Sequence, residues 1–561
     1  MIRTYLIGFI GLLIFSGELY AQSFPNCEHE YTPADASYPF VRDRVPVQLT
    51  PEKLAIGEIR VTRLPIFDEG NDKENNMLYR LANRIHILTK EPVVFQQLLF
   101  ETAEDFDPRS AAETQRLLRA QGSFFDADIR PYRVCDGKVD LEVITRDSWS
   151  LTPNLGFDRA GGENNFSIGL RDTNILGLGN QLSVAASQDI DRQSTELIYE
   201  DNNVFGTRLR NFTEFTDSDD GFTHIFDFGL PFFELDSKNS WRIRLENDER
   251  ADELFFRGEE VASAVHALER YSLEYGFSRG LVDGYSRRWL IGYGYRSDEF
   301  SKGDDLPAPA DFPSNRELSF PFIKYESIED NFVTAINLGQ IYLTEDLHIG
   351  SRLTLSVGVA AELFGSDQSR LVLQGNYADT LLYSDRQLSQ HELYFDGFWN
   401  ETSGELEDFV LNYEARYFRR QSGPFGLFVN FKAAYSENLN SNRQIVMGGI
   451  AGARAFDNRF QAGDRSVVLS VEERVYSNLH LFNLVRVGAA VFADIGRAWE
   501  PGIDDGIVDD YLSNVGIGLR LGSSKSASNR VAHIDFAIPV SNRNDPGVGS
   551  FQISIEVKES F

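Results

Sequence analysis

Residues of the kinds that build catalytic or metal centres are scarce in this sequence. Its 561 residues include two cysteines and eight histidines. His29 lies close to Cys27, but two potential ligands do not make a metal site, and the pair His391-Glu392 lacks the second histidine of a zinc-binding helix. The hydrolase motif G-x-S-x-G is absent. We therefore expect no enzyme, no catalytic residue, no metal and no cofactor.

Basic residues and long apolar runs are scarce too. Lysine and arginine number 54 against 85 aspartates and glutamates, which gives a net charge of −31. An acidic surface argues against nucleic acid as a partner, because nucleic-acid binding needs a basic footprint. Beyond the N-terminus no run reaches the roughly 18 apolar residues that a membrane helix needs. The chain is either a soluble acidic protein or one that enters a membrane as strands.

The first 21 residues are typical of a secretory signal peptide. Arg3 supplies the positive end, Leu6–Phe15 is an apolar stretch too short to span a bilayer, and cleavage is expected after Ala21. Residues 22–51 follow without clear periodicity, so we expect an extended arm there. Export therefore places the rest of the chain in an oxidising compartment.

An oxidising compartment permits a disulfide between Cys27 and Cys135. Such a bridge would join the arm to the domain that follows it. The alternative is two unpaired thiols.

Residues 52–147 have the pattern of one compact α/β unit. Alternation predicts a strand over Ile59–Ile66, and helical spacing predicts helices over Glu74–Ile87 and Pro108–Ala120. Thr89 is a candidate N-cap for a helix between them. The last two predicted strands, Phe125–Val134 and Lys138–Thr145, flank the hairpin turn Asp136-Gly137.

From residue 149 to the C-terminus the dominant pattern is alternation over about ten residues, followed by turn residues. In the final segment Phe551, Ile553, Ile555 and Val557 alternate with polar residues and lead in register to Phe561. A soluble sandwich also alternates, but about 410 residues of this pattern without a second core favour a membrane barrel. We predict a mostly β fold, an antiparallel transmembrane β-barrel over 149–561 with between 16 and about 20 candidate strands.

The most distinctive stretch is a glycine-rich loop within Met447–Tyr476, which holds Arg454 and Phe456. The next two strands place Glu472 and Asp494 on polar faces. Because a lone buried charge is very costly, we expect the loop to be tucked into a polar lumen and held there by ion pairs.

This loop resembles the motif (V/I/L)-R-G-(F/Y) of the outer-membrane assembly barrels of the BamA/TamA type, the bacterial surface antigen family. Here the motif is Ala453-Arg454-Ala455-Phe456, with alanine in place of a glycine that adopts backbone angles alanine resists. The resemblance implies 16 strands, both ends of the barrel wall in the periplasm, and an inward loop over 440–465. Arg454, Phe456, Glu472 and Asp494 would lock that loop. The alternative is an ordinary ion pair in the lumen.

The small domain shares the resemblance. Phe100–Ile129 is similar to the POTRA module that precedes such barrels, and Asp172–Gln181 is another similar stretch. The resemblance implies one POTRA-like periplasmic domain over 52–147. POTRA modules bind other chains by adding a strand to a sheet edge, so we expect a client, or a periplasmic or lipoprotein partner, at this domain. The alternative is a rigid plug or spacer.

The resemblance implies a bacterial outer-membrane protein that assembles, inserts or translocates other proteins. The seam between the first strand, near Leu151–Asp158, and the last, Phe551–Phe561, would expose strand edges to a client. Phe551, Ile553, Ile555, Val557 and Phe561 resemble a barrel-targeting signal. Expected partners are outer-membrane lipid, lipopolysaccharide and unfolded outer-membrane or secreted clients. The alternatives are a passive transport barrel for solute, polypeptide or lipid, and an outer-membrane lipase, which the missing triad disfavours.

Overall fold

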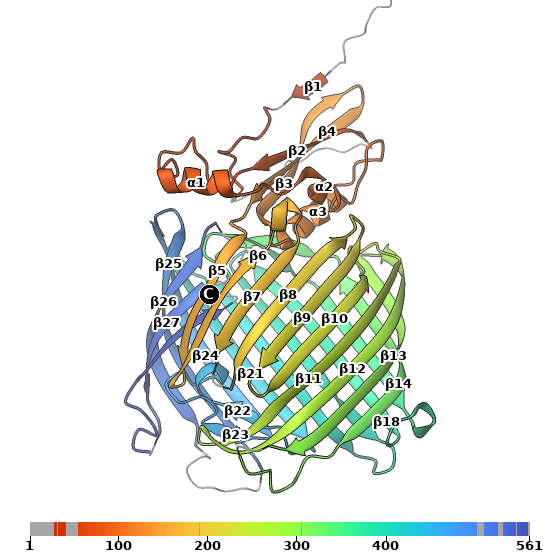
Figure 1. Cartoon of the computed structure of the whole chain (residues 1–561). Helices are drawn as coiled ribbons and strands as arrows, with labels where there is room; N and C mark the ends of the chain where they lie inside the picture. The colour runs from red at the N-terminus through yellow and green to blue at the C-terminus, as the bar shows by residue number, and fades with distance from the viewer. Residues whose placement is uncertain are drawn as a thin grey trace, which may run out of the picture.

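A small N-terminal domain stands over one end of a large β-barrel (Figure 1). The computed structural model describes residues 27–30, 32–40, 54–189, 191–303, 306–501, 510–525, 531–545 and 547–558. The predicted signal peptide and most of the predicted arm lie outside these ranges. No helix within them is long and apolar enough to cross a membrane. We call the barrel end below the N-terminal domain the domain end, and the opposite end the far end.

The N-terminal domain packs two helices, α2 and α3, on one face of a four-stranded sheet of order β1-β3-β4-β2, and a third helix, α1, lies beside the sheet (Figure 1). Strand β2 runs parallel to β4, and the other neighbours are antiparallel. Its elements are β1 (Cys27–Glu30), β2 (Ala55–Leu64), α1 (Met77–Ile85), α2 (Glu91–Phe95), α3 (Pro108–Ala120), β3 (Phe124–Cys135) and β4 (Lys138–Asp147).

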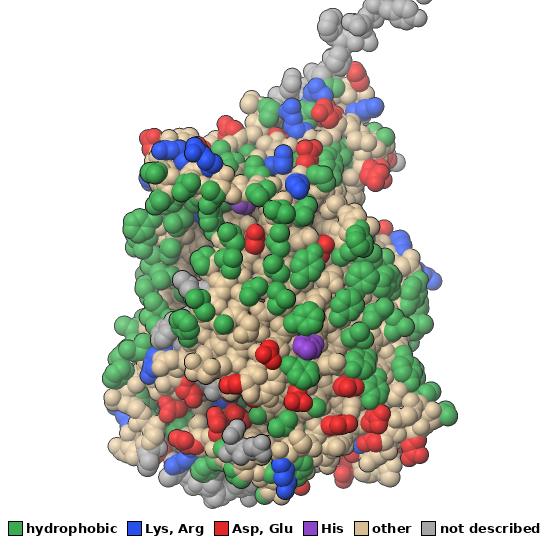
Figure 2. Space-filling view, viewed as in Figure 1, with side chains coloured by type: hydrophobic (Ala, Val, Ile, Leu, Met, Phe, Trp, Pro, Cys, Tyr) green, Lys and Arg blue, Asp and Glu red, His purple; other side chains and the backbone are tan. Residues whose placement is uncertain are grey.

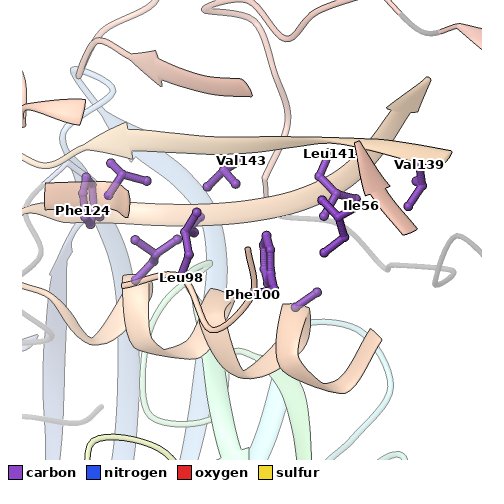
Figure 3. Close-up of a cluster of buried hydrophobic side chains, with 11 residues drawn as sticks. Ile56, Leu98, Phe100, Phe124, Val139, Leu141 and Val143 are labelled. Carbon is purple, nitrogen blue, oxygen red and sulfur yellow. The ribbon is translucent and has the colours of Figure 1, made fainter. Parts of the chain in front are cut away.

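Apolar side chains from the sheet and the helices form the core of this domain (Figure 3). Helix α3 begins where predicted, because Asp107 caps it by accepting from the N–H groups of Arg109 and Ser110 and Pro108 fills its first turn. The prediction of Thr89 as an N-cap is wrong. Helix α2 begins at Glu91 after Lys90, and Thr89 instead donates its hydroxyl to Asp147 at 2.9 Å, because that buried carboxylate needs a donor.

The described part of the arm packs against the sheet. Strand β1 pairs with β3, and Cys27 and Cys135 are Cα partners in that pairing. Cys135 is disulfide-bonded, and the chain has two cysteines in all. Further along, Phe40 is buried, and the guanidinium of Arg146 donates to the carbonyl of Ala36 at 2.6 Å. The described arm is therefore part of the domain.

Within the described residues, twenty antiparallel strands close into the barrel. The 16 strands that the family resemblance implies are wrong for this chain, whereas twenty lies at the upper end of the range counted from alternation. Alternation gives only a range, because it shows which face a side chain occupies but not where the ladder of paired strands closes. The wall strands are β5 (Leu151–Ala160), β6 (Glu163–Asp172), β7 (Gln181–Gln188), β8 (Gln193–Val204), β9 (Leu209–Ser218), β10 (Gly221–Leu230), β11 (Asn239–Phe256), β12 (Glu259–Val282), β13 (Tyr285–Lys302), β14 (Arg316–Glu329), β17 (Ser351–Ala360), β18 (Arg370–Ser384), β19 (Gln387–Asn400), β20 (Leu406–Arg420), β21 (Phe425–Glu437), β24 (Arg465–Leu481), β25 (Val485–Trp499), β26 (Leu512–Ser523), β27 (Val531–Pro539) and β28 (Gln552–Lys558).

The wall has an apolar outside and a polar inside. In β25, Val491 and Ile495 are exposed on the outer surface, whereas Phe492 and Asp494 are buried on the lumen side. Figure 2 shows hydrophobic side chains covering the wall and acidic side chains gathered towards the far end. This division matches the lipid-facing and lumen-facing sides of a membrane barrel.

Two short hairpins lie apart from the wall. Strands β15 (Phe332–Ile336) and β16 (Thr344–His348) pair with each other in the connection that leads from β14 to β17, at the domain end. Strands β22 (Ile445–Met447) and β23 (Gln461–Gly463) pair within the segment between β21 and β24, at the far end. We refer to residues 330–349 as the domain-end hairpin and to residues 438–464 as the inward loop.

Candidate functional site

Arg454 fastens the inward loop to three strands of the wall. Its guanidinium contacts both carboxylate oxygens of Asp494 in β25, at 2.9 and 2.8 Å. It also donates to Glu472 in β24 at 2.9 Å and to Asp535 in β27 at 3.0 Å. The guanidinium lies 3.4 Å above the ring centre of Phe492. Bidentate and stacked contacts of this kind suit arginine and not lysine.

Two further arginines balance the charge of this cluster. Arg474 donates to Glu472 at 3.0 Å, and Arg520 pairs with Asp535. The three arginines thus face three carboxylates, and all six side chains are at most 9% exposed. Balance matters, because a buried charge without its partner is far more costly than a satisfied pair. We call Arg454, Arg474, Arg520, Glu472, Asp494 and Asp535 the charge cluster.

An apolar anchor lies next to the charge cluster. Phe456 is buried with Met447, Phe460 and Phe492. Ala455, which stands in the position of the motif glycine, is not among the residues with a left-handed backbone, whereas Ala453 has φ 59°. The strain that a glycine would relieve therefore lies two residues earlier than the motif suggests.

Past Phe456, the inward loop contacts both sides of the junction between the first and last wall strands. Asp457 accepts a hydrogen bond from the side chain of Gln552 in β28 at 2.7 Å. The side-chain amide of Asn458 donates to the carbonyl of Ala160 in β5 at 2.8 Å and to Glu163 in β6 at 3.0 Å. The loop therefore joins the two ends of the wall through its own side chains.

Strands β5 and β28 close the barrel, and their described residues show little registered pairing. Among the described residues, Ile555 and Arg159 are the one pair of Cα partners across this junction. By contrast, β27 and β28 pair continuously from Val531 and Lys558 to Ala537 and Gln552. We call the β5–β28 junction the seam.

The domain-end hairpin reaches across the mouth of the barrel. Arg119 of α3 donates to both carboxylate oxygens of Asp346 in β16, at 2.7 and 2.6 Å. On the other side, Tyr476 of β24 donates its hydroxyl to the carbonyl of Leu338 at 3.2 Å. Burial lowers the pKa of the Arg119 guanidinium, but Asp346 and Asp126 outweigh it and raise the pKa overall. The hairpin links the N-terminal domain to the inner wall.

The sequence matches the Omp85 superfamily domain over residues 174–556, which is more than half of the chain. The chain belongs to the Omp85 superfamily. It is accordingly a bacterial outer-membrane protein of the β-barrel type, in agreement with the resemblance to the BamA/TamA barrels. The N-terminal domain lies outside the matched residues.

Several solved structures resemble this Omp85 barrel at low identity. BamA from Haemophilus ducreyi lacking POTRA domains 1–3 is 13% identical, with 89% of this chain and 84% of that chain covered and a TM-score of 0.40. CdiB from Escherichia coli is 12% identical, with 90% and 76% covered and a TM-score of 0.45. Comparison with curated protein sequences finds no match. The family assignment rests on the domain match.

The structure brings together the four side chains proposed for the loop lock, Arg454, Phe456, Glu472 and Asp494. Sequence reasoning missed Asp535, Arg474 and Arg520 as partners, although alternation places all three on the lumen face. Phe551, Ile553 and Val557 are exposed and Ile555 is half-buried, whereas Phe561 lies outside the described residues. The sequence did contain a reason to expect further arginines beside the loop lock. Arg454 alone cannot neutralise two buried carboxylates, Glu472 and Asp494.

Proposed function

We propose that this Omp85 barrel is an outer-membrane assembly or insertion factor that works through its seam. The observation that carries the proposal is the sparse registered pairing of β5 with β28 within the part of the chain that the structure describes. Unpaired N–H and C=O groups at a strand edge are a template for another strand, and lipid offers them no alternative partner. An unfolded outer-membrane client would add its own strand there.

The first strand has a feature typical of an edge. Pro153 lies within β5, opposite Leu170 of β6. Proline has no N–H to donate, so within sheets it is confined to edges, strand starts and bulges. This supports a seam at which β5 is poised between its β28 neighbour and an incoming strand.

In this proposal the inward loop holds the seam closed. The charge cluster fixes the loop to β24, β25 and β27, and Asp457 and Asn458 extend its hold to β28 and β5. Opening the seam requires breaking the contact of Asp457 with β28, breaking the contacts of Asn458 with β5 and β6, or moving the loop. The loop therefore sets how readily the seam opens.

We propose further that the N-terminal domain is POTRA-like and faces the periplasm. Its strand β2 is an edge of the sheet, as is required for strand addition. A periplasmic or lipoprotein partner, or a client segment, would dock along β2. The bridge between Cys27 and Cys135 would then hold the four-residue strand β1 at the opposite edge, which leaves the ten-residue strand β2 as the longer edge for docking.

The test is quantitative proteomics of isolated outer membranes from the bacterium that carries this chain, compared with a deletion strain and a complemented strain. A defined set of barrel or surface proteins should fall in the deletion strain and return on complementation. If every other outer-membrane protein keeps its level, the assembly proposal is wrong.

A passive transport barrel is less well supported, because side chains obstruct both ends of the lumen. The inward loop enters from the far end, and the domain-end hairpin meets the inner wall at the other.

Replacing residues 331–349 by a short Gly-Ser linker should therefore raise ion conductance in planar bilayers by about an order of magnitude, as expected for opening a wide barrel. Glu362–Phe364, an exposed 3-10 turn between β17 and β18, is a matched place for a control linker. Large conductance in the unaltered chain would favour the passive channel instead.

A further inference from the structure

A stripe of exposed apolar side chains runs along α1. Met77 is 77% exposed, Leu78 72%, Leu81 48% and Ile85 60%. At 3.6 residues per turn these four side chains fall within an arc of roughly 100° on the helix surface. Single exposed apolar residues need no explanation, but a continuous stripe on a short helix indicates a surface that another apolar phase covers.

A different face of α1 fixes its orientation. Tyr79 and Ala82 are buried with Ile66 and Phe67, and the rings of Tyr79 and Phe67 stack at 4.2 Å. The Tyr79 hydroxyl donates to the carbonyl of Phe482, in the turn between β24 and β25. The helix is therefore held on the barrel, and its apolar stripe is presented in a fixed direction.

The attachments before and after α1 place its segment across the seam. Before the helix, Glu74 pairs with Lys525, in the connection after β26, at 2.9 Å. After the helix, the Lys90 N–H donates to the carbonyl of Gly177, between β6 and β7, at 2.8 Å. Strands β27, β28, β5 and β6 lie between these two attachments in the barrel order. The segment that contains α1 thus crosses the domain end of the seam.

The stripe continues onto the lipid-facing wall. Phe482, Leu479 and Leu481 are exposed at the adjoining end of β24, and Val491 is exposed on the neighbouring β25. Figure 2 shows hydrophobic side chains running from the region of α1 down the wall, with lysine and arginine side chains above them. A protein partner on this face would have to displace lipid from the wall.

Basic residues flank the stripe where lipid phosphates are expected. Arg80 and Arg84 are exposed on α1 beside the apolar arc, on the side away from Tyr79. A helix with an apolar face and a basic flank lies in the plane of a membrane surface, where anionic headgroups attract the cations.

We propose that α1 is an interfacial helix that dips into the phospholipid surface at the domain end of the seam. Met77, Leu78, Leu81 and Ile85 lie among the acyl chains, and Arg80 and Arg84 lie at the phosphates. The partner is the bilayer that surrounds the barrel. This inference rests on the barrel spanning the membrane and does not depend on the assembly function. If the barrel also works as proposed, the inserted helix α1 disturbs the bilayer at the place where a client strand would enter.

Met77 is a built-in probe for this proposal. The chain has three methionines; Met1 lies in the predicted signal peptide and Met447 is fully buried. Chloramine-T, a charged oxidant that stays in water, converts accessible methionine to its sulfoxide. The mature full chain is placed in nanodiscs of phosphatidylethanolamine and phosphatidylglycerol, and oxidation of Met77 and Met447 is followed by peptide mass.

In these nanodiscs Met77 should oxidise about tenfold more slowly in the unaltered chain than in Leu78→Glu, because the added charge expels the helix from lipid. Leu363→Glu, which alters an exposed leucine outside α1, should leave Met77 protected. Slow oxidation of Met447 in all three chains verifies that each barrel is folded. Equally fast oxidation of Met77 in the unaltered chain and in Leu78→Glu places the stripe in water, and equally slow oxidation means that insertion of the helix is not what protects Met77; either result overturns the proposal. Protection that requires an added periplasmic extract overturns it as well, since a protein then covers the stripe.

Discussion

Arg454→Ala is expected to free the inward loop while the barrel wall stays paired. The substitution leaves Glu472, Asp494 and Asp535 facing Arg474 and Arg520, so one buried negative charge loses its partner. Removing one member of a buried ion pair costs about 3–5 kcal/mol, enough to shift a loop equilibrium more than a hundredfold. The wall keeps its backbone ladder, because Arg454 lies outside it.

Trypsin provides the measurement, because Arg443 and Arg459 lie in the inward loop. In the folded protein, cleavage at these two sites should be about tenfold or more faster in Arg454→Ala than in the unaltered chain. In the bacterium, the clients identified by proteomics should fall as they do in the deletion strain, with the level of the variant itself unchanged.

Three further variants distinguish the loss of the buried ion pairs from a general destabilisation of the barrel. Arg465→Ala is the matched control, since Arg465 makes a partly exposed pair with Asp464 at 3.7 Å, and such pairs contribute about 0–1 kcal/mol. Arg454→Lys should be intermediate, because lysine keeps the charge but loses the bidentate contact. Arg454→Met together with Asp494→Asn should recover part of the loss by restoring charge balance. Unchanged cleavage in Arg454→Ala would show that other contacts hold the loop.

Local chemistry made parts of this fold predictable from the sequence. Helix α3 begins at its predicted residue because a capping aspartate precedes a proline. The turn between β3 and β4 falls at Asp136 and Gly137, both with positive φ, as a two-residue hairpin requires. In each case the signal lies within a few neighbouring residues.

The long-range features could not be predicted in the same way. Alternation placed Glu472, Asp494 and Asp535 on lumen faces, but their meeting at Arg454 depends on the stagger of β24, β25 and β27. The domain-end hairpin alternates like a wall strand, and only its pairing shows that it lies apart. The size of the barrel is likewise a property of the closed ladder of strands.

A disulfide across the seam should abolish assembly without unfolding the barrel. Arg159 and Ile555 are Cα partners on β5 and β28, and directly paired residues in antiparallel strands have the Cα separation that a disulfide needs. In Arg159→Cys/Ile555→Cys the seam cannot open under oxidising conditions. The levels of the clients should fall by about tenfold or more, because the strand edges are no longer available.

The matched control shares one residue with the seam variant. Ile534 and Ile555 are Cα partners on β27 and β28, so Ile534→Cys/Ile555→Cys forms a similar bridge that leaves the seam free. This control should assemble clients normally, and a reductant should restore activity to the seam variant alone. Peptide mapping verifies both bridges and the separate pairing of Cys135. If the seam-bridged chain assembles clients at the normal rate, clients do not use the seam. Translocation through the lumen, with movement of the inward loop and the domain-end hairpin, then becomes the better account of this barrel.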